Sequence, residues 1–232
     1  GSEMCIRDRQ QATNLKAAAE CLATTKRYMA LARNYVESFA SPILIILHGL
    51  SGSGKSWLAE QLLESYGAIQ IRSDVERKRL LGLEAQAKTK SDLGRGAYSQ
   101  DMTAQTYQRL LELASQILQA GPSVIVDATF LKKTYREQFQ QLALSLKIPY
   151  VILDLQASEE TLKSRVVQRV EQEQDASEAT LTVLQQQIET NEAITADEME
   201  YTIPVDMDRE LDINELVQQI RQHKKVINND SA

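Results

Sequence analysis

The stretch GLSGSGKS, from Gly49 to Ser56, follows the apolar run Ile43–Leu47 and precedes a segment of helical pattern, WLAEQLLESY. It matches G-x-x-x-x-G-K-[ST], the phosphate-binding loop, in the strand–loop–helix context that this motif requires. Glycines let the backbone turn tightly and bring its N–H groups close to an anion, and the positive end of the following helix adds to the attraction. The stretch therefore predicts a site for a polyphosphate.

Two side chains of this loop have specific expected roles. Lys55 should reach the terminal phosphates of ATP, and the Ser56 hydroxyl should ligate Mg²⁺. A Gly/Ser-rich turn that binds nothing is the alternative, which the flanking strand and helix disfavour. The side chains of His48, His223 and Trp57 are expected to serve packing or the surface. The residues expected to bind the nucleotide are Gly49, Ser51, Gly52, Ser53, Gly54, Lys55, Ser56 and Trp57.

Composition is typical of a soluble cytoplasmic enzyme. The chain has 232 residues, of which 43% are hydrophobic, and it contains no apolar run near the ~18 residues of a membrane span. The net charge of −6 argues against broad electrostatic capture of nucleic acid. Cys5 and Cys21 show neither metal-ligand spacing nor a disulfide framework, which fits a reducing compartment. The expected partner is a small molecule, with no membrane partner.

The first forty residues are expected to lie outside the main domain. Residues 1–9 combine a tag-like Gly1-Ser2 with a segment of no evident role, and residues 10–40 have the apolar spacing of a long amphipathic helix. That helix either packs on the domain behind it or once linked it to an upstream domain that is absent here. Ser41-Pro42 marks the boundary, because proline stops a helix, and residues 41–232 form the predicted domain.

After this boundary, apolar strand-like runs alternate with helical patterns. Such alternation predicts an α/β fold with a parallel sheet between helices, whose ligands bind beyond the carboxyl ends of the strands. The expected strands are Ile43–Leu47, Ala68–Arg72, Ser123–Ala128, Tyr150–Leu155 and Tyr201–Val205. The expected helices are Lys55–Tyr66, Val75–Leu81, Gln100–Ala120, Lys132–Leu146, Glu159–Glu173, Ala176–Ala193 and Ile213–Ile227.

The second strand ends in IRSDVERKRL, which places Arg72, Ser73 and Asp74 at the mouth of the predicted site. A carboxylate beside ATP can accept the proton of an attacking hydroxyl, so Asp74 is a candidate general base. Arg77, one turn later, can stabilise charge on the transferring phosphoryl group. Asp74 is also a residue type that caps helices, and that structural role is the alternative. Arg72 is a weaker candidate for substrate contact.

The third strand, VIVDAT, ends near the phosphate loop. Asp127 suits a role in organising Mg²⁺, with a buried carboxylate satisfied by backbone N–H groups as the alternative. The residues after it either touch substrate or line the start of a helix: Thr129, Lys132, Lys133 and Arg136.

Further along the chain, Arg165 and Arg169 are four residues apart and share a helix face. That face could close over the triphosphate as a lid, or the arginines could pair with Glu171 and Glu173. The spacing of Asp175 and Glu178 matches a capping box, which favours a structural role. Tyr98 and Arg95, in LGRGAYSQ, are weak substrate candidates.

The segments GLSGSGKS, IRSDVERKRL, VIVDATFLKKTYR and DASEATLTVLQ, in this order, resemble the P-loop kinase domain of a family of bacterial predicted kinases. That domain often follows an aminoglycoside-phosphotransferase-like domain and is similar to gluconate kinase, chloramphenicol phosphotransferase, zeta toxin and polynucleotide kinase. The resemblance covers about residues 43–206. It implies a nucleoside-monophosphate-kinase-like core with strand order 2-3-1-4-5. It also implies that Arg165 and Arg169 are lid arginines and that Asp74 is the base.

Three functions remain open. An ATP-dependent kinase acting on a hydroxyl of a small molecule is favoured, because a carboxylate at the second strand end suits phosphoryl transfer. A 5′-hydroxyl polynucleotide kinase would need a basic, aromatic-lined channel, which 5% aromatic residues and a negative net charge support poorly. A nucleotide-dependent regulatory NTPase module is the third. Sequence does not name the acceptor, because loop side chains decide it.

Overall fold

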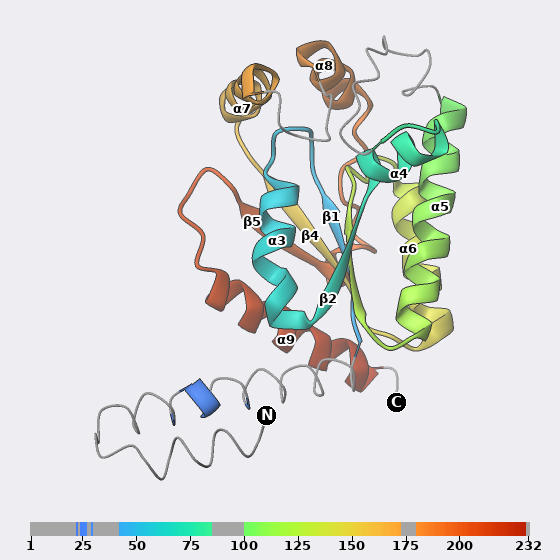
Figure 1. Cartoon of the computed structure of the whole chain (residues 1–232), viewed down its shortest axis with the longest axis vertical. Helices are drawn as coiled ribbons and strands as arrows, with labels where there is room; N and C mark the ends of the chain where they lie inside the picture. Colours follow the sequence, from blue (N-terminus) through green and yellow to red (C-terminus); the bar gives the residue numbers. More distant parts are fainter. Residues whose placement is uncertain are drawn as a thin grey trace, which may run out of the picture.

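Five parallel strands form the centre of the molecule, in the spatial order β2-β3-β1-β4-β5 (Figure 1). The computed structural model describes residues 22, 24–26, 29, 42–84, 100–172 and 180–230. The expected strand order is confirmed. The strands are β1 (Leu44–His48), β2 (Ala68–Arg72), β3 (Ser123–Asp127), β4 (Tyr150–Gln156) and β5 (Thr202–Asp206).

Burial along the strands explains which of them are central. Every residue of β1 and β3 is buried, as continuous apolar runs in a sheet covered on both faces should be. The edge strands β2 and β5 are mixed in exposure. Strand β5 contains Pro204, a residue that cannot donate a ladder hydrogen bond and is tolerated at a sheet edge.

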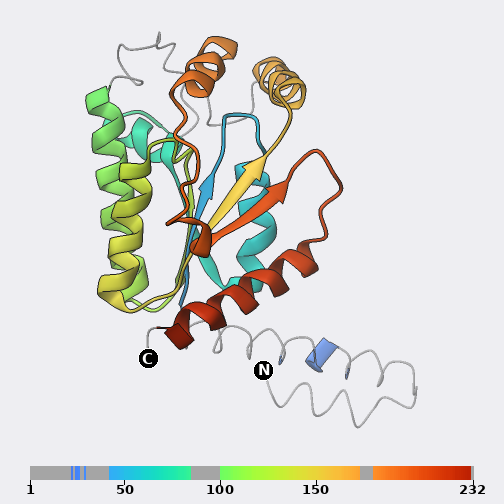
Figure 2. The same ribbon diagram turned by 180° about the vertical axis from the view of Figure 1, so that it is seen from behind.

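Helices cover both faces of this sheet. The helices are α3 (Lys55–Tyr66), α4 (Ser73–Leu80), α5 (Gln100–Gln119), α6 (Lys133–Leu146), α7 (Glu159–Gln172), α8 (Leu181–Thr190) and α9 (Ile213–Asp230), with a short 3₁₀ helix η2 (Met199–Tyr201) before β5. Alternate residues of β1 pack in opposite directions: Ile45 and Leu47 belong to the core under α3 and α9, whereas Leu44 and Ile46 belong to the core under α5 and α6. Helices α7 and α8 lie beyond the carboxyl end of β1 (Figures 1 and 2).

The observed boundaries differ from the expected ones by small shifts, with two informative exceptions. Helix α4 begins at Ser73, directly after β2, and not at Val75. Helix α8 ends at Thr190 and not at Ala193, because Asn191 leaves the helical conformation. Its start is fixed by Thr180, whose side chain accepts a hydrogen bond from the Val183 N–H. The expected capping box at Asp175 and Glu178 lies outside the described residues.

Most of the helix expected over residues 10–40 also lies outside the described residues. Within it, Leu22 and Met29 are helical and expose 53% and 69% of their surface. Among the described helices, none combines the length and the apolarity that a bilayer crossing needs.

Candidate active site

A cavity of about 560 Å³ lies at the carboxyl ends of the strands. Its walls come from the phosphate loop, from the starts of α4, α5 and α6, from the end of β3 and from α7 and α8. This is where a parallel sheet is expected to bind its ligand. The lining residues used below are Ser51, Gly52, Lys55, Ser56, Asp74, Arg77, Thr103, Tyr107, Asp127, Thr129, Lys132, Tyr135, Arg169, Gln186, Gln187 and Thr190.

The phosphate loop is packed tightly under α7. Gly52 has a φ of +87°, and a Cβ atom added there would lie 2.8 Å from the Leu162 carbonyl oxygen and 3.2 Å from a Val166 methyl group. Only glycine combines that φ with so close an approach of backbone to backbone. The loop therefore depends on glycine for contact with α7 as well as for its turn.

The ammonium group of Lys55 is folded back onto the loop. It donates to the carbonyl oxygens of Gly49 at 2.9 Å and Leu50 at 2.7 Å, and it lies 3.4 Å from the Ser53 hydroxyl. Burial lowers the pKa of Lys55 from 10.5 to about 8, with a further lowering from Arg169 and opposing effects from Asp127 and Asp74. The hydrogen-bond acceptors of this ammonium group are neutral oxygens, and a bound polyphosphate would add a negatively charged partner.

Ser56 and Asp127 form the predicted metal-binding pair. The Ser56 hydroxyl donates to Asp127 Oδ2 at 2.7 Å, and Gln70 Nε2 donates to the same oxygen at 3.1 Å. Burial raises the pKa of Asp127, although Ser56, Lys55 and Arg72 act against the shift. Mg²⁺ retains several waters and takes one or two protein oxygens plus phosphate oxygens, so this donor set fits it. The Ser56 hydroxyl oxygen can ligate the ion through a lone pair while its proton is donated in the hydrogen bond to Asp127.

Asp74 and Arg77 are paired at the rim of the same cavity. Arg77 Nη1 donates to Asp74 Oδ1 at 2.8 Å, and both residues line the cavity. The alternative role of Asp74 as a helix cap is wrong, because Arg72 occupies the N-cap position and no side chain caps α4. Arg72 itself lies against Asp127, with Nε 3.4 Å from Oδ2, and does not line the cavity.

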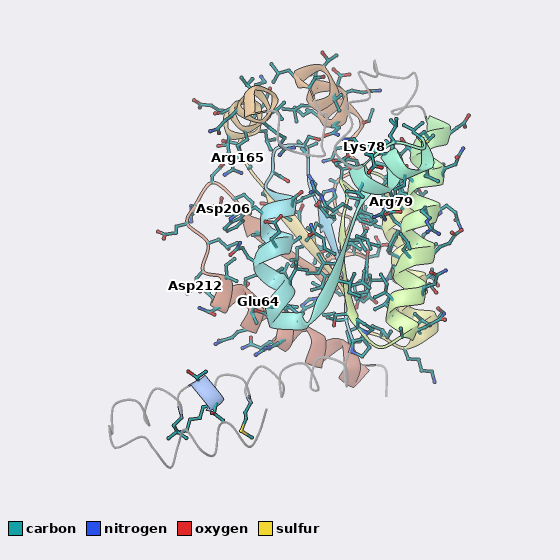
Figure 3. All side chains as sticks on the ribbon, viewed as in Figure 1. Glu64, Lys78, Arg79, Arg165, Asp206 and Asp212 are labelled. Carbon is teal, nitrogen blue, oxygen red and sulfur yellow. The ribbon has the colours of Figure 1, made fainter. Side chains whose placement is uncertain are left out.

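The two arginines of α7 have different environments. Arg169 lines the cavity, whereas Arg165 lies on the side of α7 that faces the loop after β5 (Figure 3). Arg165 Nη2 donates to the Met207 carbonyl at 2.9 Å, and Nη1 lies 3.4 Å from the Gly52 carbonyl. Arg169 therefore lies where a ligand in the cavity could reach it, whereas Arg165 contacts the Gly52 carbonyl of the phosphate loop and the Met207 carbonyl.

The substrate role expected for Arg136 is not compatible with its position. Arg136 is 1% exposed, and it donates to both carboxylate oxygens of Glu198 at 2.6 and 2.8 Å. Its remaining bonds go to the carbonyl oxygens of Phe130, Glu192 and Ala193. Its guanidinium thus anchors the segment between α8 and β5.

Gly49 and Trp57, both expected to bind the nucleotide, do not line the cavity, and neither does His48. The 48% exposure of Trp57 fits the surface role expected of its side chain. Gly49 packs against the backbone of β4, since an added Cβ would lie 2.9 Å from the Leu155 carbonyl oxygen. His48 is buried beside Asp154, with Nδ1 2.6 Å from Oδ1.

The residues after β3 divide between the cavity and the surface. Thr129 and Lys132 line the cavity, and Lys132 pairs with Glu192 at 2.9 Å. Lys133 pairs with Asp197 instead. Tyr98 and Arg95 lie outside the described residues.

Several lining residues had no signal in the sequence. Tyr107 and Tyr135 stack with ring centroids 3.9 Å apart, and the Tyr107 hydroxyl accepts a hydrogen bond from the Phe130 N–H at 2.9 Å. Each lies within a helical segment that carries no site motif in the sequence. Gln186 and Gln187 of α8 look like surface residues in sequence, and only the approach of α8 to the loop places them in the cavity.

The sheet order, with a phosphate loop and a carboxylate facing one cavity at its carboxyl edge, is that of P-loop kinase folds. Within this class the chain belongs to the AAA_33 family, described as an AAA domain, whose sequence profile matches residues 44–194. The match confirms the family resemblance. It includes β1 to β4 and α8 and stops before β5.

Known proteins agree with this assignment. An uncharacterized protein of Mycobacterium tuberculosis is 29% identical over 158 residues, which are 68% of this chain and 32% of that protein, so the chain spans about a third of this relative. A gluconokinase from Sinorhizobium meliloti is 22% identical with a TM-score of 0.55, covering 82% of this chain and 95% of its own. Chaetomium thermophilum Kti12 in complex with ADP-AlF3 is 17% identical with a TM-score of 0.61, covering 78% and 98%. The two structures share the fold.

Proposed function

We propose that this protein is an ATP-dependent phosphotransferase that moves the γ-phosphoryl group of ATP to a hydroxyl group of a small molecule. The observation that carries this proposal is the shared cavity: Lys55 of the phosphate loop and the Asp74 carboxylate line the same 560 Å³ space. A nucleotide phosphate and an acceptor hydroxyl could therefore meet there. Both a cation for the phosphates and a candidate base for the hydroxyl would be in reach.

The proposed step transfers one phosphoryl group. The acceptor oxygen forms a bond to the γ-phosphorus while the bond from that phosphorus to the bridging oxygen breaks, and ADP leaves with the electron pair. The hydroxyl proton passes to the carboxylate of Asp74, which Arg77 holds in orientation at 2.8 Å. Lys55 and Arg169 stabilise the negative charge on the phosphates. Ser56 and Asp127 would hold Mg²⁺, which would supply positive charge to neutralise the phosphate oxygens.

The cavity lining contributed by elements other than the phosphate loop suits a hydroxylated small molecule. It includes neutral hydrogen-bonding groups and the aromatic ring of Tyr135; the neutral groups are Thr103, Thr129, Gln186 and Thr190. The nearby Lys132 is already paired with Glu192. The fold shared with a gluconokinase is consistent with an acceptor of this kind.

A transfer assay tests the proposal. The protein is incubated with ATP, Mg²⁺ and separate sugars, polyols, sugar acids, nucleosides and a 5′-hydroxyl oligonucleotide, and products are identified by their added phosphate mass. We expect a phosphorylated small molecule. In the matched variant Asp74→Asn, transfer should fall by roughly two to four orders of magnitude while ATP affinity stays near the parent value, the usual scale for loss of a general base.

Other results would redirect the proposal. A phosphorylated oligonucleotide as the only product would favour a polynucleotide kinase. ATP hydrolysis that no acceptor accelerates would favour a regulatory NTPase. Near-normal transfer by Asp74→Asn would mean that another carboxylate acts as the base.

A further inference from the structure

Helix α8 is packed onto the phosphate loop by an apolar cluster. Leu184 of α8 is buried together with Leu162 and Val166 of α7, and Leu50 of the loop and Ile188 of α8 pack against them. Leu184 is 1% exposed. Two views place α7 and α8 side by side above the loop (Figures 1 and 2). This cluster fixes the polar face of α8 toward the cavity.

Gln187, on that polar face, makes a direct hydrogen bond to the loop. Its Oε1 accepts the Ser51 N–H at 2.8 Å, across 136 residues of sequence. The orientation of the amide follows from chemistry, because a backbone N–H only donates and must face the oxygen. Within the described chain, the amide nitrogen of Gln187 makes no hydrogen bond. Since Gln187 lines the cavity, its two N–H donors remain for a ligand there.

The position of Lys55 indicates where a terminal phosphate would lie relative to this amide. The Lys55 ammonium contacts the carbonyl oxygens of Gly49 and Leu50, immediately before Ser51 in the loop. In a phosphate loop this lysine reaches the β- and γ-phosphates. The ammonium group of Lys55 and the amide of Gln187 therefore contact adjacent residues of the phosphate loop, from Gly49 to Ser51.

We propose that Gln187 is a ligand-binding residue that recognises the γ-phosphate. Its oxygen holds the Ser51 N–H, and its amide nitrogen donates to a terminal phosphate oxygen, so α8 distinguishes a nucleoside triphosphate from a diphosphate. This inference rests on the proposed function only in taking ATP as the ligand. It predicts a contact present with ATP and absent with ADP.

Two variants separate recognition from structure. Gln187→Glu keeps an oxygen for the Ser51 N–H but replaces the donors by a negative charge, and Gln187→Met removes both polar atoms at similar length. Gln185→Glu is the matched control, because Gln185 is an exposed residue of the same helix and receives the same charge change. Calorimetry measures the affinity of each protein for a non-hydrolysable ATP analogue and for ADP in the presence of Mg²⁺. No acceptor is required.

We expect Gln187→Glu to weaken binding of the ATP analogue by about tenfold to a hundredfold, the worth of a charge-assisted hydrogen bond. ADP affinity should change by less than about threefold, and the Gln185→Glu control should bind both nucleotides as the parent does. If Gln187 had a purely structural role, its substitution would weaken the binding of the ATP analogue and of ADP equally. An unchanged ratio of the two affinities in both Gln187 variants would therefore overturn the inference. If the parent binds the analogue yet phosphorylates no hydroxyl, the proposed function fails and the affinity ratio still decides the role of Gln187.

Discussion

Proton uptake by Lys55 should accompany ATP binding above neutral pH. Burial lowers the pKa of this lysine to about 8 in the free protein, so about half of the molecules carry a neutral amine at pH 8 and about nine tenths at pH 9. The phosphates of ATP would raise the pKa, because an adjacent anion favours the charged ammonium. Binding should therefore take up about 0.5 proton at pH 8 and about 0.9 at pH 9.

The sign of the pH effect on affinity follows from the same shift. Because the pKa of Lys55 is higher in the complex than in the free protein, affinity is greatest below the free value and declines as pH rises between the two values. From pH 7 to pH 9 the affinity for ATP with Mg²⁺ should fall by about tenfold. The phosphate groups contribute little to this change, since their last pKa is near 6.

Calorimetry in two buffers of different ionisation enthalpy measures the uptake, as the dependence of the apparent binding enthalpy on the buffer. The control variant is Lys55→Arg, whose guanidinium keeps its proton throughout this pH range. ATP binding by this variant should therefore show no proton uptake at residue 55. Uptake near zero in the parent at pH 8.5, or equal uptake in parent and Lys55→Arg, would refute the link between burial and charge at this residue.

Three other perturbations test the remaining assignments. Asp127→Asn should leave ATP binding in place but make it less responsive to Mg²⁺, measured by titrating the metal at fixed nucleotide, and an unchanged response would make Asp127 structural. Arg136→Met should lower the free energy of unfolding by about 3–5 kcal/mol in urea, because it leaves the Glu198 carboxylate buried and unpaired. The control Lys133→Met should have little effect, because the partner that it leaves, Asp197, is 65% exposed. A decrease in the free energy of unfolding of less than about 1 kcal/mol for Arg136→Met would contradict the structural role of Arg136. Tyr135→Leu should raise the KM of the acceptor and leave the KM of ATP unchanged, and equal changes in both would remove Tyr135 from the acceptor side.

The sequence predicted those parts of the site that depend on local pattern. The phosphate loop carries its own signature from Gly49 to Ser56, and the strand-end rule correctly placed Asp74 and Asp127 at the cavity. Both follow runs of apolar, β-branched residues that form buried or half-buried strands. A residue at the carboxyl end of such a strand can be assigned to the site without reference to distant segments of the chain.

Arg136 shows where local pattern was insufficient. In sequence it is one of three cations after β3, equivalent to Lys132 and Lys133, yet the three have different partners. Arg136 is buried because Glu198, 62 residues later, supplies a carboxylate in the core. Lys132 reaches Glu192 at the rim of the cavity. Nothing within a few residues of these cations encodes the difference.

The sequence by itself determined the class of the fold, because apolar runs with periods of strands and helices, a glycine-rich loop and a proline at an edge strand are properties of short segments. Only the tertiary structure decided which polar side chains share the cavity. Gln187 meets Ser51 across 136 residues, and Tyr135 stacks on Tyr107 from another helix. Hydrogen-bond partners and burial are set by how distant segments pack, and it is these that give a charged or polar side chain its chemistry.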